Sequence, residues 1–208
     1  MNQENAAARE AVRQLGELSE LASEVARTQG EEIAGLADDV LEALRGGGKI
    51  LFCGNGGSAA DAQHLEAEYV VRFRSERPAL AAIALTTDTS VLTAAGNDFG
   101  FHRLFARQVE ALGRPGDLLV LHSTSGESEN LLEAARAARA LGLGTVALSA
   151  KGGGRLAVEV DRCITVPTEV TARAQEVQLT IGHIVCDWVE RALAVSAGDS
   201  PHSQPDTP

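Results

Sequence analysis

The chain has 208 residues, of which 44% are hydrophobic and 3% aromatic, and a formal net charge of −11. This length fits one domain whose core is built mainly from Ala, Val, Leu and Ile. The acidic balance, without any basic run, argues against a nucleic-acid partner, because phosphate backbones need clustered Lys and Arg. No stretch of about 18 uninterrupted apolar residues is present, so we expect no membrane span. The N-terminus lacks the apolar core of a signal peptide, and we expect a cytoplasmic protein.

Residues 5–45 predict a pair of helices, because apolar side chains recur there at helical spacing. The first stripe contains Leu15, Leu18, Leu21, Ala22 and Val25, and the second contains Ile33, Leu36, Val40, Leu41 and Leu44. A break is expected near residues 28–30, and the glycines at 46–48 end the second helix. Such a pair can serve as an oligomerisation surface or as a further layer of the same monomer, and the sequence leaves both open.

Residues 49–195 alternate between short apolar runs and helical patterns. The predicted strands are 49–53, 81–85, 118–122, 145–148 and 162–166, and the predicted helices are 58–73, 88–95, 101–112, 128–141 and 171–194. Continuous apolar strands alternating with helices are typical of a parallel sheet covered on both faces. The predicted fold class is therefore α/β, a doubly wound parallel sheet of five strands, in one domain over residues 1–195. The tail, 196–208, is rich in Ser, Pro and Asp and is expected to be disordered.

Two polar loops follow predicted strands and open predicted helices. The first reads CGNGGS over residues 53–58, and the second reads STSGES over residues 123–128. Hydroxyl groups, glycines that allow close backbone approach and a helix N-terminus together favour an anion such as a phosphate. The alternative is that these residues only cap and turn the chain. Neither loop matches the Walker A motif or the dinucleotide fingerprint, which disfavours nucleotide binding.

Four polar side chains on two predicted helices form a second candidate site. His64 and Glu68 are four residues apart and share a helix face, and Gln175 and His183 are eight apart on the last helix. Such a set can bind zinc or another divalent ion, or it can transfer protons with the carboxylate as base and an imidazole as acid. Each residue can also be an ordinary helix-face side chain, so spacing alone leaves metal binding open.

Several other positions carry weaker signals. Asp98 can bind sugar hydroxyls or form an Asx turn that ends a helix. His122, directly before the second loop, is expected to fill a strand end, and contact with a ligand is the alternative. The three cysteines are far apart, odd in number and in apolar settings, which predicts free thiols: Cys53, Cys163 and Cys186.

The motifs taken together resemble those of a known family. CGNGGSAADAQH, RPALAAIALTTDTSVLTAAGNDFG, STSGES, and QE followed by GHIV are similar to the motifs of the sugar isomerase (SIS) fold family and, within it, the phosphoheptose isomerases. The resemblance implies conversion of D-sedoheptulose 7-phosphate to D-glycero-D-manno-heptose 7-phosphate through an enediol, the first step of nucleotide-activated heptose biosynthesis. It also implies one zinc ion (Zn²⁺) per subunit and a homotetramer with active sites at subunit interfaces.

The resemblance also assigns roles to individual residues. Glu68 and His183 match the family's proton-transfer pair, and the implied zinc ligands are His64, Glu68, Gln175 and His183. The positions that match substrate contacts are Asn55, Gly56, Gly57, Ser58, Glu68, Asn97, Asp98, Ser123, Thr124, Ser125, Ser128 and Gln175. The hydroxyl groups of the second loop would hold the phosphate. The chain departs from some members at Ala172, where they have Asp, so any role of that Asp is lost or replaced.

Three alternative interpretations remain. Non-catalytic SIS proteins that bind the bacterial replication initiator share many core motifs, but they characteristically lack the Glu and the late His that stand here as Glu68 and His183. An SIS isomerase that acts on another sugar phosphate is the second alternative, and a panel of substrates separates it. A pure binding module is the third, and it requires all four helix-face polar groups to be incidental.

Overall fold

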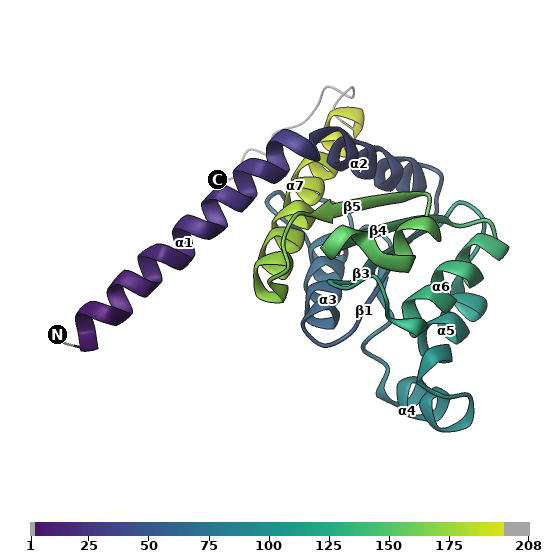
Figure 1. Ribbon diagram of the computed structural model, residues 1–208. Helices are drawn as coiled ribbons and strands as arrows, with labels where there is room; N and C mark the ends of the chain where they lie inside the picture. The colour runs from purple at the N-terminus through teal and green to yellow at the C-terminus, as the bar shows by residue number, and fades with distance from the viewer. Residues whose placement is uncertain (1–2, 198–208) are drawn as a thin grey trace, which may run out of the picture.

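A computed structural model describes residues 3–197. Five parallel strands form one sheet in the order β2-β1-β3-β4-β5 (Figure 1). The strands are β1 (Ile50–Gly54), β2 (Ala82–Ala84), β3 (Leu118–His122), β4 (Gly144–Ala150) and β5 (Arg162–Val166). This is the predicted doubly wound parallel sheet, and its strand order is that of flavodoxin-like folds.

Helices cover both faces of the sheet. They are α1 (Gln3–Thr28), α2 (Gly30–Arg45), α3 (Gly57–Val70), α4 (Thr89–Asp98), α5 (Leu104–Leu112), α6 (Glu129–Ala140) and α7 (Thr171–Ala197), with two 3-10 segments, η1 (Phe101–Arg103) and η2 (Lys151–Val158). α2, α3 and α7 pack on one face, and α5 and α6 pack on the other (Figure 1). β1 and β3 are buried along their whole length because both of their faces are covered.

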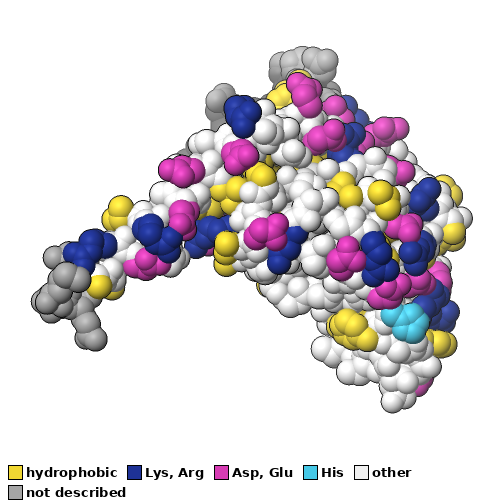
Figure 2. Space-filling model, viewed as in Figure 1, with side chains coloured by type: hydrophobic (Ala, Val, Ile, Leu, Met, Phe, Trp, Pro, Cys, Tyr) yellow, Lys and Arg dark blue, Asp and Glu magenta, His cyan; other side chains and the backbone are white. Residues whose placement is uncertain are grey.

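α1 leaves the body of the molecule. Figure 1 shows it projecting as an arm from the rest of the protein. Arg173 on α7 donates hydrogen bonds to the backbone and side-chain oxygens of Gln14 on this arm, at 3.5 and 3.2 Å. Val25 is 3% exposed and joins the core, whereas Val12 and Leu15 are 72% and 66% exposed. Apolar side chains stand along this arm beside charges of both signs (Figure 2). The predicted helical pair is confirmed, but the first half of α1 forms no layer over its own monomer.

Some predicted boundaries differ from the observed ones. The predicted helix 58–73 ends at Val70. The Val71 N–H still donates to the Ala67 carbonyl, but the N–H groups of Phe73, Arg74 and Ser75 donate to the Glu190 carboxylate on α7 instead of continuing α3. The predicted helix 101–112 is divided into η1 and α5. η2 was not predicted, and its glycines at 152–154 have positive φ angles that interrupt regular helical geometry. α7 runs to Ala197, beyond its predicted end at 194, so the first two residues of the predicted tail, 196 and 197, are helical. The rest of the predicted tail, from 198 onward, lies outside the described residues.

The N-terminal end of the sheet is closed by a buried carboxylate. Asp117 is 4% exposed and accepts hydrogen bonds from the backbone N–H groups of Lys49 and Arg114. The Lys49 ammonium group donates to the same carboxylate at 2.5 Å. Because the chain itself satisfies this carboxylate, Asp117 has a structural role here.

Two predictions about the class of protein are tested by the structure. All three cysteines are free thiols, as predicted. None of the helices between residues 3 and 197 is long and apolar enough to cross a membrane.

Candidate functional site

A polar cavity of about 260 Å³ lies at the carboxyl ends of β1 and β3. The chain passes from β1 to β2 on one side and then returns to β3 on the other, and doubly wound folds bind ligands at such a reversal. Both predicted loops and α7 line the cavity, through Asn55, Gly57, Ser58, His122, Ser123, Thr124, Ser125, Ser128, Leu131, Thr171 and Gln175. α3 and α6 both begin at this cavity, so two helix N-termini favour an anion there.

Asn55 and Asn130 tie the first loop to the first turn of α6. The side-chain nitrogen of each donates to the side-chain oxygen of the other, at 3.0 and 2.8 Å. Within the second loop the Ser123 hydroxyl accepts from the Gly126 N–H, and Gly126 has a φ of 67°, which suits glycine. Ser128 stands at the predicted N-cap position of α6, but its side chain makes no capping hydrogen bond. Its hydroxyl group is therefore available to a ligand.

Gln175 reaches the first loop from α7. A Cβ added to Gly57 would lie 2.5 Å from the side-chain nitrogen of Gln175, so the amide occupies the space that a side chain would need. Further along the same two helices, His64 lies against His183. The contacts advance in the same direction on both helices, so α3 and α7 run parallel and side by side away from the cavity.

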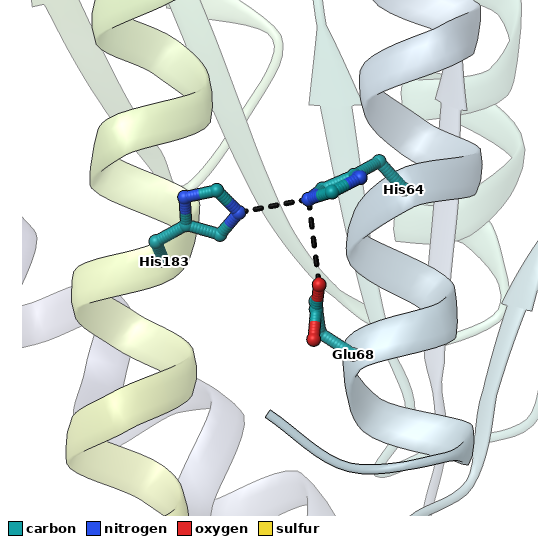
Figure 3. Close-up of side chains that lie close together, drawn as sticks. All are labelled: His64, Glu68 and His183. Atoms are coloured by element: carbon teal, nitrogen blue, oxygen red, sulfur yellow. Dashed lines mark hydrogen bonds and ion pairs between the residues drawn. The ribbon is translucent and has the colours of Figure 1, made fainter. Parts of the chain in front are cut away.

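The second candidate site lies along these two helices. His64 and Glu68 on α3 and His183 on α7 point toward one another (Figure 3). The Nε2 atoms of the two histidines are 2.9 Å apart, and Nε2 of His64 is 3.4 Å from Oε1 of Glu68. One ligand atom from each residue lies within 4.8 Å of the other two. Two imidazole nitrogens and a carboxylate oxygen form a donor set that zinc accepts, so this cluster fits a metal ion as well as proton transfer.

The surroundings of His183 favour its neutral form. Burial lowers the pKa of the imidazole, the nearby His64 lowers it further, and Glu68 acts in the opposite direction. The ring of Phe73 stacks on the imidazole, with centroids 5.5 Å apart and planes inclined by 22°. A neutral imidazole is the form that accepts a proton and that binds a metal ion.

One predicted zinc ligand lies apart from the other three. Gln175 is eight residues before His183, which is about 12 Å along α7. Its amide lines the polar cavity beside Gly57. Within one chain, therefore, three of the four predicted ligands converge, and the side chain of Gln175 belongs to the cavity.

Asn97 and Asp98 also lie apart from the cavity. They are the last two residues of α4, both are exposed, and the Asn97 amide donates to the Asp98 carboxylate at 2.7 Å. Neither belongs to the cavity lining. In the single chain they form a helix end, which is the alternative that the sequence left open for Asp98.

Two residues of the cavity, Leu131 and Thr171, lack a predicted role in binding. Thr171 begins α7 and Leu131 lies in the first turn of α6, so the only sequence signal for either residue is its position at the start of a predicted helix. His122 fills the end of β3, as predicted, and also lines the cavity. Burial lowers its pKa to about 4, and neither of its ring nitrogens has a partner among the described residues.

Comparison with known proteins agrees with this geometry. The profile of the SIS domain matches residues 15–150. A phosphoheptose isomerase of Roseiflexus sp. (strain RS-1) is 58% identical over 166 residues, which cover 80% of this chain and 84% of that protein.

Two solved structures of phosphoheptose isomerases superpose on nearly the whole chain. The protein from Neisseria gonorrhoeae gives a TM-score of 0.82 at 43% identity, covering 91% of this chain and 98% of its own. The protein from Francisella tularensis gives a TM-score of 0.85 at 37% identity, covering 89% and 98%. The chain therefore belongs to the SIS domain family and, within it, to the phosphoheptose isomerases.

Proposed function

We propose that this protein is a ketose–aldose isomerase that converts D-sedoheptulose 7-phosphate to D-glycero-D-manno-heptose 7-phosphate. Besides family membership, one structural observation supports this substrate. The polar cavity and the His64–Glu68–His183 cluster lie along the same parallel helices, and the step from Gly57 to His64 on α3 is about 10 Å. An extended seven-carbon sugar with a terminal phosphate has a comparable length. Phosphate in the cavity would place the other end of the sugar at the cluster.

The cavity supplies the groups that would hold the phosphate. Hydroxyl groups of the second loop donate hydrogen bonds, and the N-termini of α3 and α6 contribute positive dipole ends. The first loop adds backbone N–H groups, and Gln175 adds its amide. We assign substrate contact to the cavity residues Asn55, Gly57, Ser58, Ser123, Thr124, Ser125, Ser128 and Gln175, together with Gly56 between them. Asn97 and Asp98 remain proposed contacts on the strength of the family motif alone.

The cluster supplies the groups that would move protons. The reaction removes a proton from C1 of the ketose and returns one to C2, while the hydroxyl proton passes from O1 to O2. We assign the first step to the Glu68 carboxylate as base and the second to the His183 imidazole as acid, through an enediol: the neutral imidazole would take up the abstracted proton from Glu68 and return it to C2. His64 contacts both side chains and fixes their separation.

The cluster would also hold zinc. His64, Glu68 and His183 would be its ligands, and the fourth position is left for substrate or for Gln175 of a second copy. When bound, zinc would act as a Lewis acid and stabilise negative charge on the sugar oxygens. A carboxylate held firmly by a metal is a weak base, so the response of activity to zinc separates a catalytic from an inhibitory metal.

We further propose a cytoplasmic homotetramer with active sites at subunit interfaces. A groove of about 670 Å³ between α2 and α7 includes His183 among its lining residues. Ile184 and Trp188 on α7 line the same groove and are about half exposed, at 50% and 51%. An apolar surface of this kind beside the cluster supports a subunit interface there. The free cysteines fit a reducing compartment.

The test is formation of aldoheptose phosphate from sedoheptulose 7-phosphate, with and without added zinc. We expect turnover by the wild type and a loss of at least about a hundredfold in kcat for Glu68→Gln. Glu42→Gln, an exposed carboxylate at the opposite end of the sheet, is the matched control and should leave kcat unchanged. No turnover at any zinc concentration would contradict the assignment, and activity on a shorter sugar phosphate would redirect it to another SIS isomerase.

A further inference from the structure

Glu190 on α7 is a buried carboxylate outside the candidate site. Its side chain accepts hydrogen bonds from the backbone N–H groups of three successive residues, Phe73, Arg74 and Ser75, at 3.3, 2.8 and 2.9 Å. Nε of Arg77 lies 3.1 Å from its Oε1, and both side chains are nearly inaccessible to solvent. One carboxylate with these four partners holds the segment between α3 and β2 firmly against α7.

The first residue of the segment that Glu190 holds, Phe73, forms a wall of the candidate site. Its ring is the one that stacks on the imidazole of His183. The guanidinium group of Arg74 lies over the same ring, 5.4 Å from its centroid, and pairs with Asp187 on α7 at 3.5 Å. Glu190 is seven residues, or two helical turns, beyond His183, so the two side chains share a face of α7 without touching.

The second partner, Arg77, connects Glu190 to the helix that carries Glu68. Its guanidinium group donates to the backbone oxygen of Glu68 at 2.6 Å and to that of Tyr69 at 2.8 Å. α3 ends at Val70, so these oxygens belong to its last turn, where a cation is favourable. Arg77 thereby fixes the end of α3 relative to α7.

We propose, on the basis of the isomerase function above, that Glu190 and Arg77 are positioning residues for the reaction. Glu190 holds Phe73 flat against the imidazole of His183, and Arg77 holds the backbone of Glu68. Together they set the distance and orientation between the proposed base and the proposed acid, although neither contacts the sugar. Rates depend steeply on such positioning, and a displacement of about 1 Å can cost a hundredfold.

The test uses Glu190→Gln in the full-length chain, with two readouts. The first is the NMR signal of the His183 ring, which is assigned by its absence in His183→Gln. The ring current of the stacked Phe73 shifts this signal upfield. We expect Glu190→Gln to move the signal downfield, whether zinc is added or removed. The second is the isomerase assay, where we expect kcat to fall about tenfold or more with KM changed less than about threefold.

Asp117→Asn is the matched control, because Asp117 is also a buried carboxylate that binds backbone N–H groups and a cation. Asp117→Asn should lower the free energy of unfolding by an amount similar to that for Glu190→Gln, but it should leave the His183 signal and kcat unchanged. Phe73→Leu keeps the carboxylate and removes the ring, so it should reproduce both changes even if Glu190→Gln does not fold. Glu190→Gln with an unchanged His183 signal overturns the proposal. If the wild type shows no isomerase activity, the NMR readout still decides whether Glu190 positions His183.

Discussion

His122 stands at the point where the sheet meets the polar cavity, and its protonation is coupled to folding. Burial lowers the pKa of the folded chain's imidazole to about 4 from the ordinary value of 6.5. The unfolded chain therefore binds a proton between these two pH values while the folded chain does not. Above about pH 6.5 His122 is neutral in both states and does not lower the free energy of unfolding. As the pH falls from there toward about 4, protonation of the unfolded chain lowers that free energy.

We expect His122 to make the fold sensitive to acid. In phosphate-free buffer, the free energy of unfolding of the wild type should fall between pH 7 and pH 5 by about 2 kcal/mol more than that of His122→Leu. Urea titrations at the two pH values measure this difference. His102→Leu is the control, because His102 is exposed, and it should behave like the wild type. An equal fall for wild type and His122→Leu would show that the buried imidazole has no part in acid sensitivity.

At the level of elements, α3 and α7 form the frame of the site. The cavity lies where α3 begins, and the cluster lies about two turns further on. Their separation at the cavity is set by Gly57, where the Gln175 amide takes the place of a side chain. The amide is the flexible end of a long side chain, so it can move without displacing either helix.

Gly57→Ala should therefore impair binding more than folding. The added Cβ would displace the Gln175 amide, and losing one hydrogen bond to a charged phosphate should raise KM about tenfold while kcat changes little. The free energy of unfolding should stay the same or rise, because alanine favours helix over glycine. Gly16→Ala on α1 is the control, since nothing lies within 4 Å of an added Cβ there. Steady-state kinetics measure KM and kcat, and urea titrations measure the free energy of unfolding. An unchanged KM would show that Gln175 does not bind the phosphate.

The elements that could be predicted from sequence are those determined by local pattern. The sequence predicts β3 at its observed bounds because the apolar run LLVL, ended by His122, is preceded by a turn. It does not predict the end of α3, because that end depends on a hydrogen-bond acceptor, Glu190, more than a hundred residues away. The same limit applies to the site. The spacing of His64 and Glu68 revealed a shared helix face, but no spacing shows that Gln175 lies beside Gly57 rather than beside His183.

At the level of the whole molecule, the projecting arm and the groove beside His183 both point to assembly. The exposed apolar side chains of the first half of α1 contact little of their own chain. A single chain gives them no core to join, and a subunit interface would bury them.

We expect the double variant Val12→Glu, Leu15→Glu to dissociate the assembly. The monomer should keep its fold, because both side chains are mostly exposed within one chain. Sedimentation at several protein concentrations should show a smaller species than the tetramer proposed for the wild type, with isomerase activity reduced in parallel. Val158→Glu is the control, because Val158 is 81% exposed on η2 and lies away from the arm. A double variant that sediments like the wild type would exclude the arm from the interface.

The parallel course of α3 and α7 gives the proposed enzyme a molecular ruler. Two packed helices do not stretch, so the separation between the anion cavity and the His64–Glu68–His183 cluster is fixed by the fold. A sugar phosphate with fewer carbons could anchor its phosphate equally well, yet its carbonyl would stop short of the base. Such molecules would occupy the enzyme without being converted. The enzyme would then discriminate against shorter sugar phosphates because they do not span the distance from the cavity to the base, without any side chain that repels them.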